Sequence, residues 1–497
     1  MDDHDCCKDE QCCCGPSRRT VLAGAGAAAV PMLLRPLALR AAEGDAKAAK
    51  RTKTPAAIRA VFLYPPSETF AKNPNGWWSW PGNEFDAEAR QKKYTAALGK
   101  MAEKLGVKVT VDARPVASNA DAQRVAKEIA AKSPDGLLLV MFYNRSLGQA
   151  DALIKAAAAK NVPVIFYIGL GVKHGQIDRY RKPGMYFIQS LDNLAAIEYG
   201  LRMIGARRRM AQSLLLSITE ARKRRDGVEK FLGTTVRVIP FSEYAAIFKK
   251  VTVDASARTW IAALKRGAKQ VRGVTDEAMD NAARAYLALK KMLADNQADG
   301  LTMNCLRRGM LKPCIGFSAL NGQLIPATCE NDFAAMYTQM LGQLLTGRPG
   351  FQHNPAYETE KNHYYASHCT CATKMYGPAG PDLPYLLRRF AHTNEGSAAI
   401  QVFWKKDDPV TMVRYYAGKT PSLDVYAGKV VASHAMPPVG GCTTNVEIAL
   451  TDRTDARHVR GHHNLLFCGD FARKFRLFAN LYKMQLAKTG YTGPSAV

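Results

Sequence analysis

The residues best suited to chemistry lie on either side of one predicted helix. Glu330 stands directly before an amphipathic run. A second polar group follows the turn that ends this run: His353, Asn354, Glu358, His363 and His368. Carboxylates and imidazoles are the usual side chains for moving protons and holding divalent cations. One carboxylate at the start of the helix and a polar group beyond its end fit a site at a domain junction.

The helix itself is predicted from its apolar spacing. Apolar residues recur at helical intervals at Phe333, Met336, Tyr337, Met340, Leu341, Leu344 and Leu345. Asn331 and Asp332 suit the first turn or the cap. Gly347 and Pro349 end the helix.

Each candidate residue also has a simpler structural interpretation. Glu330 could be a helix N-terminal carboxylate that the helix dipole favours. His463, next to His462, could be a core or surface histidine. Cys329 fits packing better than reactivity.

Before this helix the chain alternates between strand and helix patterns, which predicts parallel sheets. The first predicted strands are 60–64, 107–111, 137–141 and 162–168, with helices over 86–105, 119–132 and 147–160. A second unit is predicted from strands 185–188, 214–218, 236–239, 301–303 and 315–317 and helices 191–202, 255–265 and 276–295. The expected fold is two doubly wound parallel α/β domains, 58–175 and 176–349. Gly169-Leu170-Gly171 follows a strand without a GxGxxG motif, so no dinucleotide fingerprint is present.

After about Gly350 the pattern changes to short β runs separated by Pro, Gly and Thr. The predicted strands are 399–404, 410–415, 423–431, 444–450 and 464–468, closed by a helix over 471–485. This pattern predicts an antiparallel β-barrel-like C-terminal domain over 350–490.

The N-terminus predicts export. Ser17-Arg18-Arg19-Thr20-Val21-Leu22 is a twin-arginine pattern, and the apolar run 21–34 is too short for a typical membrane span. Residues 1–42 are therefore interpreted as a Tat signal and 43–57 as a linker, with a disordered tail as the alternative. The mature protein is expected to be periplasmic or extracytoplasmic, without a membrane span.

Cysteine use and charge exclude some classes of protein. Five of the 12 cysteines precede the twin arginines, and the remaining seven show no regular framework, so a disulfide scaffold is not expected. The net charge is +26, with basic runs at 207–209 and 222–225. Without a nucleic-acid motif, these runs are interpreted as solvated helix ends, and no nucleic-acid partner is expected.

A loop with three tryptophans, Trp77, Trp78 and Trp80, is a candidate substrate-binding platform for a sugar. Such aromatic residues more often simply pack.

From Cys329-Glu330-Asn331-Asp332 onward, the order of features resembles the L-fucose isomerase and L-arabinose isomerase superfamily. Members of that superfamily have two α/β domains followed by a β-barrel-like domain. Their second domain ends in a Glu-x-Asp helix and a Thr-Gly-(basic)-Pro turn, here Thr346-Gly347-Arg348-Pro349. A His before a hydrophobic strand and a Gly is matched by the stretch from His463 to Gly469. The resemblance covers most of the mature chain in architecture, and it is specific in these stretches and at His368-Cys369-Thr370.

The resemblance implies a metal-dependent aldose–ketose isomerase, usually with Mn²⁺, that forms homo-oligomers. A hard cation polarises the sugar carbonyl, while a base moves a proton between C1 and C2. Glu330 matches the first carboxylate, as ligand and base, and His463 matches the histidine ligand. In fucose isomerases the second carboxylate is an Asp, and this chain has Asn354 there.

Asn354 is the main departure from the family pattern. Its amide oxygen can bind a cation, but it cannot usefully accept a proton, and one negative charge is lost. Arabinose isomerases have a Glu and a His after the equivalent turn, so Glu358, as a second catalytic carboxylate, and His368, as a ligand, are the expected substitutes. His353 is a further alternative.

The sequence therefore favours a sugar isomerase-like protein with a monosaccharide substrate. The alternatives are a carbohydrate-binding protein on the same fold that has lost catalysis, another metal-dependent sugar-modifying enzyme, and a basic surface-binding protein.

Overall fold

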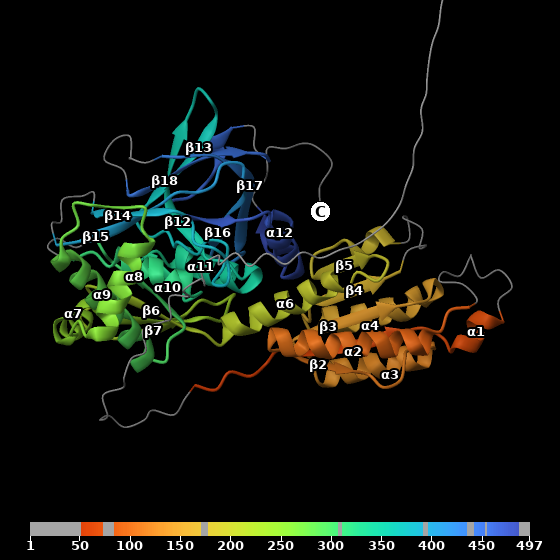
Figure 1. Cartoon of the computed structure of the whole chain (residues 1–497). Helices are drawn as coiled ribbons and strands as arrows, with labels where there is room; N and C mark the ends of the chain where they lie inside the picture. The colour runs from red at the N-terminus through yellow and green to blue at the C-terminus, as the bar shows by residue number, and fades with distance from the viewer. Residues whose placement is uncertain are drawn as a thin grey trace, which may run out of the picture. The chain divides into compact units, whose positions relative to one another are not determined.

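A computed structural model of the chain describes residues 51–72, 84–169, 177–306, 311–390, 396–434, 442–452 and 455–486. They form a mixed α/β fold with parallel sheets and a closed antiparallel β-barrel in the C-terminal region (Figure 1). The predicted signal over 1–42 and the residues Trp77, Trp78 and Trp80 lie outside the described residues. Within the described ranges, no helix is long and apolar enough to cross a membrane.

The first sheet is parallel, with strand order β2-β1-β3-β4-β5. Its strands are β1 (Ala57–Leu63), β2 (Lys108–Val111), β3 (Gly136–Met141), β4 (Val164–Ile168) and β5 (Met185–Gln189). Successive strand residues alternate between two cores. Leu137 and Leu139 pack with residues of α3 (Asn119–Ala131) and α4 (Leu147–Ala159). Leu138 and Val140 pack with residues of α2 (Ala87–Leu105) and α6 (Leu194–Ala211).

The place of β5 corrects one prediction. The strand predicted at 185–188 was assigned to the second unit. It pairs in parallel with β4, Val164 opposite Met185, and so belongs to the first sheet. The residue pattern of a strand does not indicate which sheet it joins, because that depends on which strand lies at the free edge of each sheet.

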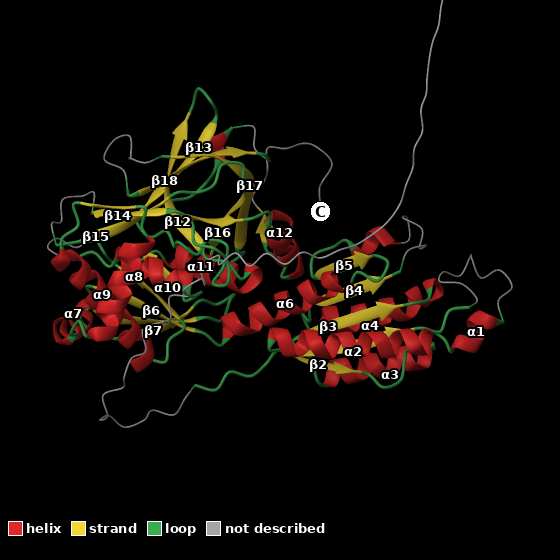
Figure 2. Ribbon diagram, viewed as in Figure 1, coloured by secondary structure: helices red, strands yellow, loops and turns green. Residues whose placement is uncertain are grey.

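The second sheet has the order β11-β10-β6-β8-β7. Its strands are β6 (Leu214–Thr219), β7 (Arg225–Val228), β8 (Thr235–Pro240), β10 (Gly300–Met303) and β11 (Ala327–Cys329). All pairs are parallel except β7–β8. The helices of this region are α7 (Phe241–Lys250), α8 (Ala255–Gly267), α9 (Asp276–Asp295) and α10 (Cys314–Gly322), and Figure 2 shows them beside the sheet. The strand predicted at 315–317 is wrong, because these residues lie within α10. A short apolar run cannot distinguish a buried strand from a buried helix.

Six antiparallel strands close into the barrel in the order β16-β19-β12-β13-β18-β17, with β17 pairing back to β16. They are β12 (Gly350–Glu358), β13 (His363–His368), β16 (Pro409–Tyr416), β17 (Ser422–Ser433), β18 (Thr444–Leu450) and β19 (Asn464–Cys468). A short β20 (Gln485–Leu486) pairs with β17 after the predicted closing helix, α12 (Ala472–Leu481).

One strand predicted for the barrel lies elsewhere. The run at 399–404 overlaps β15 (Ala398–Val402), which pairs with β14 (Tyr385–Arg389). The third strand of this small sheet is β9 (Gln270–Arg272), which comes from the α/β part of the chain.

The helix α11 (Phe333–Thr346) lies between the second sheet and the barrel. Its residues from Ala335 to Gln343 are all buried, so it is covered on every side. Asp332 caps its N-terminus by accepting from the Ala335 N–H at 2.8 Å. Gly347 ends it in a left-handed conformation, as predicted.

Close packing beneath α11 gives the first prediction. A Cβ at Gly342 would overlap the ring of Phe467. Gly342→Ala is therefore expected to destabilise the fold by about 1–3 kcal/mol, because overpacking outweighs the gain in helix propensity. The measurement is the thermal unfolding midpoint.

Gly99→Ala is the matched control. Gly99 lies on α2 with no atom within 4 Å of an added Cβ, so this variant should be unchanged or slightly more stable. Equal midpoints for the two variants would contradict the tight packing of α11 on the barrel.

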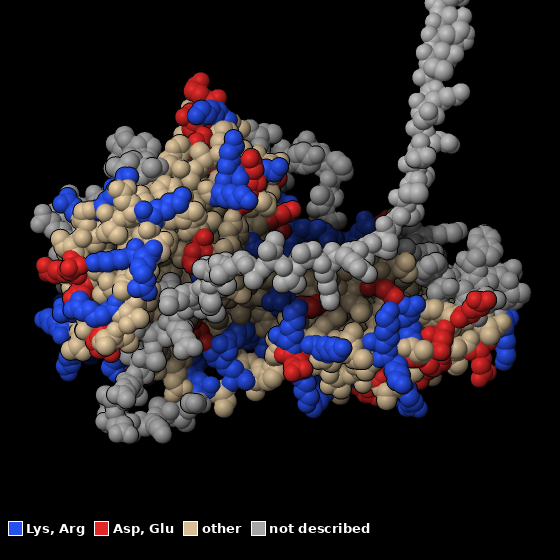
Figure 3. Space-filling view, viewed as in Figure 1, with Lys and Arg blue, Asp and Glu red and all other residues tan. Residues whose placement is uncertain are grey.

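Several residues of the two basic runs pair with neighbouring groups. Arg207 donates to the carbonyls of Phe231 and Leu232, and Arg209 pairs with Asp299 at 3.1 Å. Arg224 donates to Glu243. Figure 3 shows acidic groups interspersed among the Lys and Arg side chains of the visible face.

Candidate functional site

Glu330 lies between β11 and α11, at the carboxyl end of the second sheet. Both Glu330 and Asn331 have left-handed backbone conformations, with φ of 62° and 55°. Two neighbours hold this turn. The Ser217 hydroxyl donates to Asn331 Oδ1 at 2.7 Å, and Gln352 Oε1 accepts from the Cys329 N–H at 2.7 Å. A left-handed backbone conformation costs free energy at residues other than glycine, and such residues cluster at functional sites.

Two histidines of the barrel converge on the Glu330 carboxylate. His368 ends β13, and its Nε2 lies 3.5 Å from Oε1 of Glu330. His463 directly precedes β19, and its Nε2 lies 3.2 Å from Oε2. Each histidine is only 2% exposed. Neither Nε2 makes a hydrogen bond to any described residue. Each of these imidazole nitrogens thus faces the Glu330 carboxylate.

The opposite nitrogen of each ring is held by a second group. His463 Nδ1 lies 3.1 Å from Asp332 Oδ2, and His368 Nδ1 lies 3.3 Å from Thr370 Oγ1. Metal-binding histidines typically have such a partner, which fixes the ring and leaves the other nitrogen for the cation. The Asp332 carboxylate is itself held by Arg414, which donates to Oδ2 at 3.1 and 3.2 Å.

The spacing fits a divalent cation. Two ligand atoms about 2.1 Å from one ion, at ordinary coordination angles, lie about 3.0–3.4 Å apart. The observed separations of 3.2 and 3.5 Å are close to this range. Two groups of possible metal ligands share Glu330. One adds His462 and His463, the other adds Cys329 and His368, and the ligand atoms within each group all lie within 4.8 Å of one another.

The charges of the site are coupled. Contacts with His368 and His463 lower the pKa of Glu330 far below its usual value, against the effect of burial. For His463, burial lowers the pKa, but Asp332 and Glu330 outweigh it, so its pKa is raised. The carboxylate is thus ionised at neutral pH and attracts positive charge.

Other predicted residues are not brought into this cluster. Glu358 pairs with His363 at the far end of the β12–β13 hairpin. The length of β13, about 16 Å, separates that pair from His368. The structure therefore does not bring the predicted second catalytic carboxylate to Glu330. The buried His353 bonds to Phe351 O and Tyr364 Oη, and burial lowers its pKa to about 3, so it stays neutral.

Asn354 remains a prediction as a ligand. It lies two residues beyond Gln352 and thus on the same face of β12, the face that bonds to Cys329. Its Oδ1 is buried without a hydrogen-bond partner in the described structure. Asn354 Oδ1 is therefore a free acceptor on the same face of β12 that contacts Cys329, the residue before Glu330.

Sequence reasoning missed the positioning roles of Asp332 and Arg414. Asp332 was interpreted only as a first-turn or capping residue and as part of the Glu-x-Asp pattern, and it does cap the helix. Arg414, on β16, also donates to His463 O at 2.9 Å. No local pattern links position 414 to 332. The only indication of this role in the sequence was the spacing of Asp332 from Glu330, which places two carboxylates at the N-terminus of one helix.

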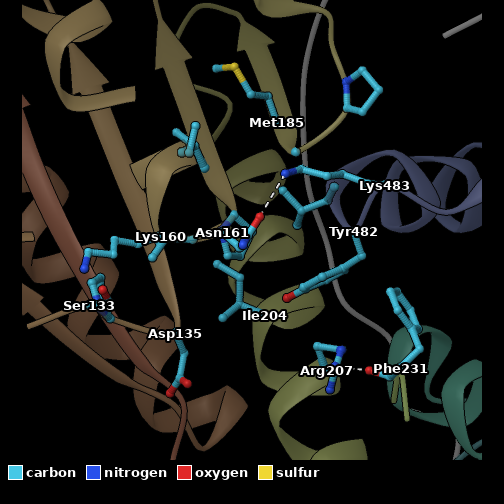
Figure 4. Close-up of a pocket in the computed structure, with 18 of the residues that line it drawn as sticks. Ser133, Asp135, Lys160, Asn161, Met185, Ile204, Arg207, Phe231, Tyr482 and Lys483 are labelled. Atoms are coloured by element: carbon cyan, nitrogen blue, oxygen red, sulfur yellow. Dashed lines mark hydrogen bonds between the residues drawn. The ribbon is translucent and has the colours of Figure 1, made fainter. Parts of the chain in front are cut away.

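A cavity lies away from this cluster. It has a volume of about 720 Å³ and is lined by residues at the amino ends of β3, β4 and β5, including Asp135, Asn161 and Met185 (Figure 4). Lys483 donates to Asn161 across it at 3.3 Å. Parallel sheets bind ligands at the carboxyl ends of their strands, and this cavity lies at the amino ends. No residue of the Glu330 cluster lines it.

No family model and no curated protein matches the chain. Among solved structures, a chain titled as a XylFII–LytSN complex mutant aligns with 59% of this chain and 92% of its own length, at 12% identity and a TM-score of 0.17. A TM-score this low carries no argument about fold or function. The candidate site therefore rests on its own geometry.

Proposed function

We propose that this protein is a metal-assisted aldose–ketose isomerase that acts on a monosaccharide and resembles the L-fucose and L-arabinose isomerases. The convergence of Glu330, His368 and His463 at 3.2 and 3.5 Å supports this proposal. In the same proposal the two parallel sheets are doubly wound α/β domains that precede the barrel. The mature protein is exported and forms a homo-oligomer.

A bound divalent cation, Mn²⁺ in the resembling family, would polarise the sugar carbonyl. The remaining chemistry belongs to the chain. The Glu330 carboxylate takes the proton from the carbon beside the carbonyl and returns it to the former carbonyl carbon, while the proton of the adjacent hydroxyl passes to the former carbonyl oxygen. Asp332 keeps the His463 ring turned, so that Nε2 points toward Glu330. The buried position of both histidines excludes water from one side of the site.

The test is solvent exchange. Purified protein is incubated with Mn²⁺ and a panel of aldoses in D₂O, and deuterium at C2 is followed by NMR. We expect metal-dependent incorporation for at least one aldose and none after chelation. If no sugar exchanges, the isomerase proposal is wrong.

A second candidate, a carbohydrate-binding protein without catalysis, is favoured by Asn354. An amide there supplies no second base. Sugar binding without exchange would support this candidate over the isomerase.

Asn354→Asp is expected to tighten Mn²⁺ binding by about tenfold or more, because it adds a negative charge on the face of β12 that contacts Cys329. Binding is measured by calorimetry on the metal-free protein. An unchanged affinity would mean that position 354 does not face the cation.

The matched control for this variant is Asn193→Asp. Asn193 caps α6 by accepting from the Ala196 N–H at 3.2 Å. Asp serves equally well at a helix cap, so this variant should bind Mn²⁺ like the unmodified protein.

A further inference from the structure

A disulfide lies directly beside the proposed cation site. Cys305 and Cys329 are bonded, with their Cα atoms 6.2 Å apart. Both residues are buried, 5% and 3% exposed. Cys329 is the last residue of β11 and immediately precedes Glu330. The bond therefore joins the carboxyl ends of two strands that already pair, with Met303 opposite Cys329.

The sulfur of Cys329 belongs to a second group of possible ligands. Its Sγ, a carboxylate oxygen of Glu330 and an imidazole nitrogen of His368 all lie within 4.8 Å of one another. His368 is 2% exposed, and its Nε2 lacks a hydrogen-bond partner among the described residues. A disulfide sulfur carries no charge and binds cations poorly, whereas a thiolate is a strong ligand. The oxidation state of Cys329 therefore decides whether this group includes a thiolate ligand.

We propose that reduction of the Cys305–Cys329 bond makes Cys329 a ligand of the Glu330–His368 site and changes the cation that the site prefers. The oxidised site offers oxygen and nitrogen ligands, which suit Mn²⁺. The reduced site adds a thiolate, which favours Zn²⁺ and related ions. This inference rests on the proposed function, because both states share Glu330 and His368.

The chemistry balances as follows. A dithiol reductant supplies two electrons and two protons, the S–S bond breaks, and each cysteine becomes a thiol while the reductant forms its own disulfide. Cation binding then displaces the Cys329 thiol proton into solvent.

The backbone keeps Cys329 beside the site without the disulfide. Gln352 bonds to both its N–H and its carbonyl, at 2.7 and 3.2 Å. The pairing of β10 with β11 also does not depend on the bond. Reduction therefore releases the sulfur while the main chain around it stays held.

Co²⁺ is the probe, because a thiolate ligand gives it a charge-transfer absorption in the near ultraviolet that oxygen and nitrogen ligands do not. The wild-type protein is compared before and after treatment with a phosphine. The phosphine takes the oxygen of a water molecule to form its phosphine oxide, and the two protons of that water go to the two thiols. We expect the band only after reduction, together with at least a tenfold lower Kd for Zn²⁺. Reduction without a band overturns the inference.

Cys305→Ser keeps the test decisive if the buried bond resists the reductant. This variant should show the band without any reductant, and Cys468→Ser should behave like the wild type. The double variant Cys305→Ser/Cys329→Ser should show no band in either state. A band that persists in the double variant comes from other cysteines and overturns the inference.

The two proposals fail separately. Loss of the reduction-dependent band overturns the ligand role of Cys329 and leaves the isomerase proposal intact. Absence of Mn²⁺-dependent deuterium exchange in the oxidised protein overturns the isomerase proposal, whatever the Co²⁺ spectra show.

Discussion

Replacing Glu330 with Gln is expected to lower metal-dependent deuterium exchange by at least about 100-fold, the range in which a positioned acid–base group contributes. The amide cannot accept the proton, and it removes the negative charge that lies 3.2 and 3.5 Å from His463 and His368. Metal affinity should fall in the same variant. Exchange rate and metal Kd are measured on the same preparation.

Glu358→Gln is the matched control for this experiment. Glu358 has the same side chain and was predicted from sequence as the second carboxylate, but it lies at the turn of the β12–β13 hairpin. We expect nearly unchanged activity. The reverse result, a silent Glu330→Gln and an inactive Glu358→Gln, would place the chemistry at the other end of the hairpin.

Asp332→Asn is expected to weaken metal binding by about 10–100-fold, as loss of a carboxylate behind a metal-binding histidine usually does. Asn keeps the cap of α11, but it takes the charge away from His463 Nδ1 and from Arg414. Some stability is lost as well, because Arg414 is only 11% exposed and loses its ionic partner. The measurements are metal Kd and the unfolding midpoint.

Asp254→Asn separates positioning from capping. Asp254 caps α8 by accepting from the Ala257 N–H at 2.8 Å, the same geometry as at Asp332. It should leave metal affinity unchanged. If both variants lose affinity equally, the effect of Asp332 is a general loss of helix stability rather than positioning of His463.

Long periodic elements were predictable from the sequence. The helices over 86–105 and 276–295 and the buried strands at 137–141 and 464–468 are present with nearly the predicted bounds. Each type of element has its own sequence pattern. Apolar residues recur with a period of 3.6 residues in a helix and form a continuous run in a buried strand. The change at Gly350 to antiparallel strands was also visible, because turn residues mark short strands.

Short elements were less predictable. Residues 315–317 lie in a helix that is buried on most of its surface, so no polar face identified it. The sequence predicted no strand at β12 or β13, where only a polar group of residues was identified. The polar residues of these two strands, including His353 and His363, obscure the alternation that would identify strands.

The sequence by itself determined the helix after Glu330, its cap at Asp332 and its end at Gly347, because these depend on neighbours within a few residues. Tertiary structure alone decided which side chains meet Glu330. His368 and His463 lie far apart in sequence and reach one carboxylate because β13, β12 and β19 are adjacent in the closed barrel. The register of β12 and β13 likewise places Glu358 at the turn of the hairpin, away from Glu330. The pairing of β10 with β11 places Cys305 next to Cys329.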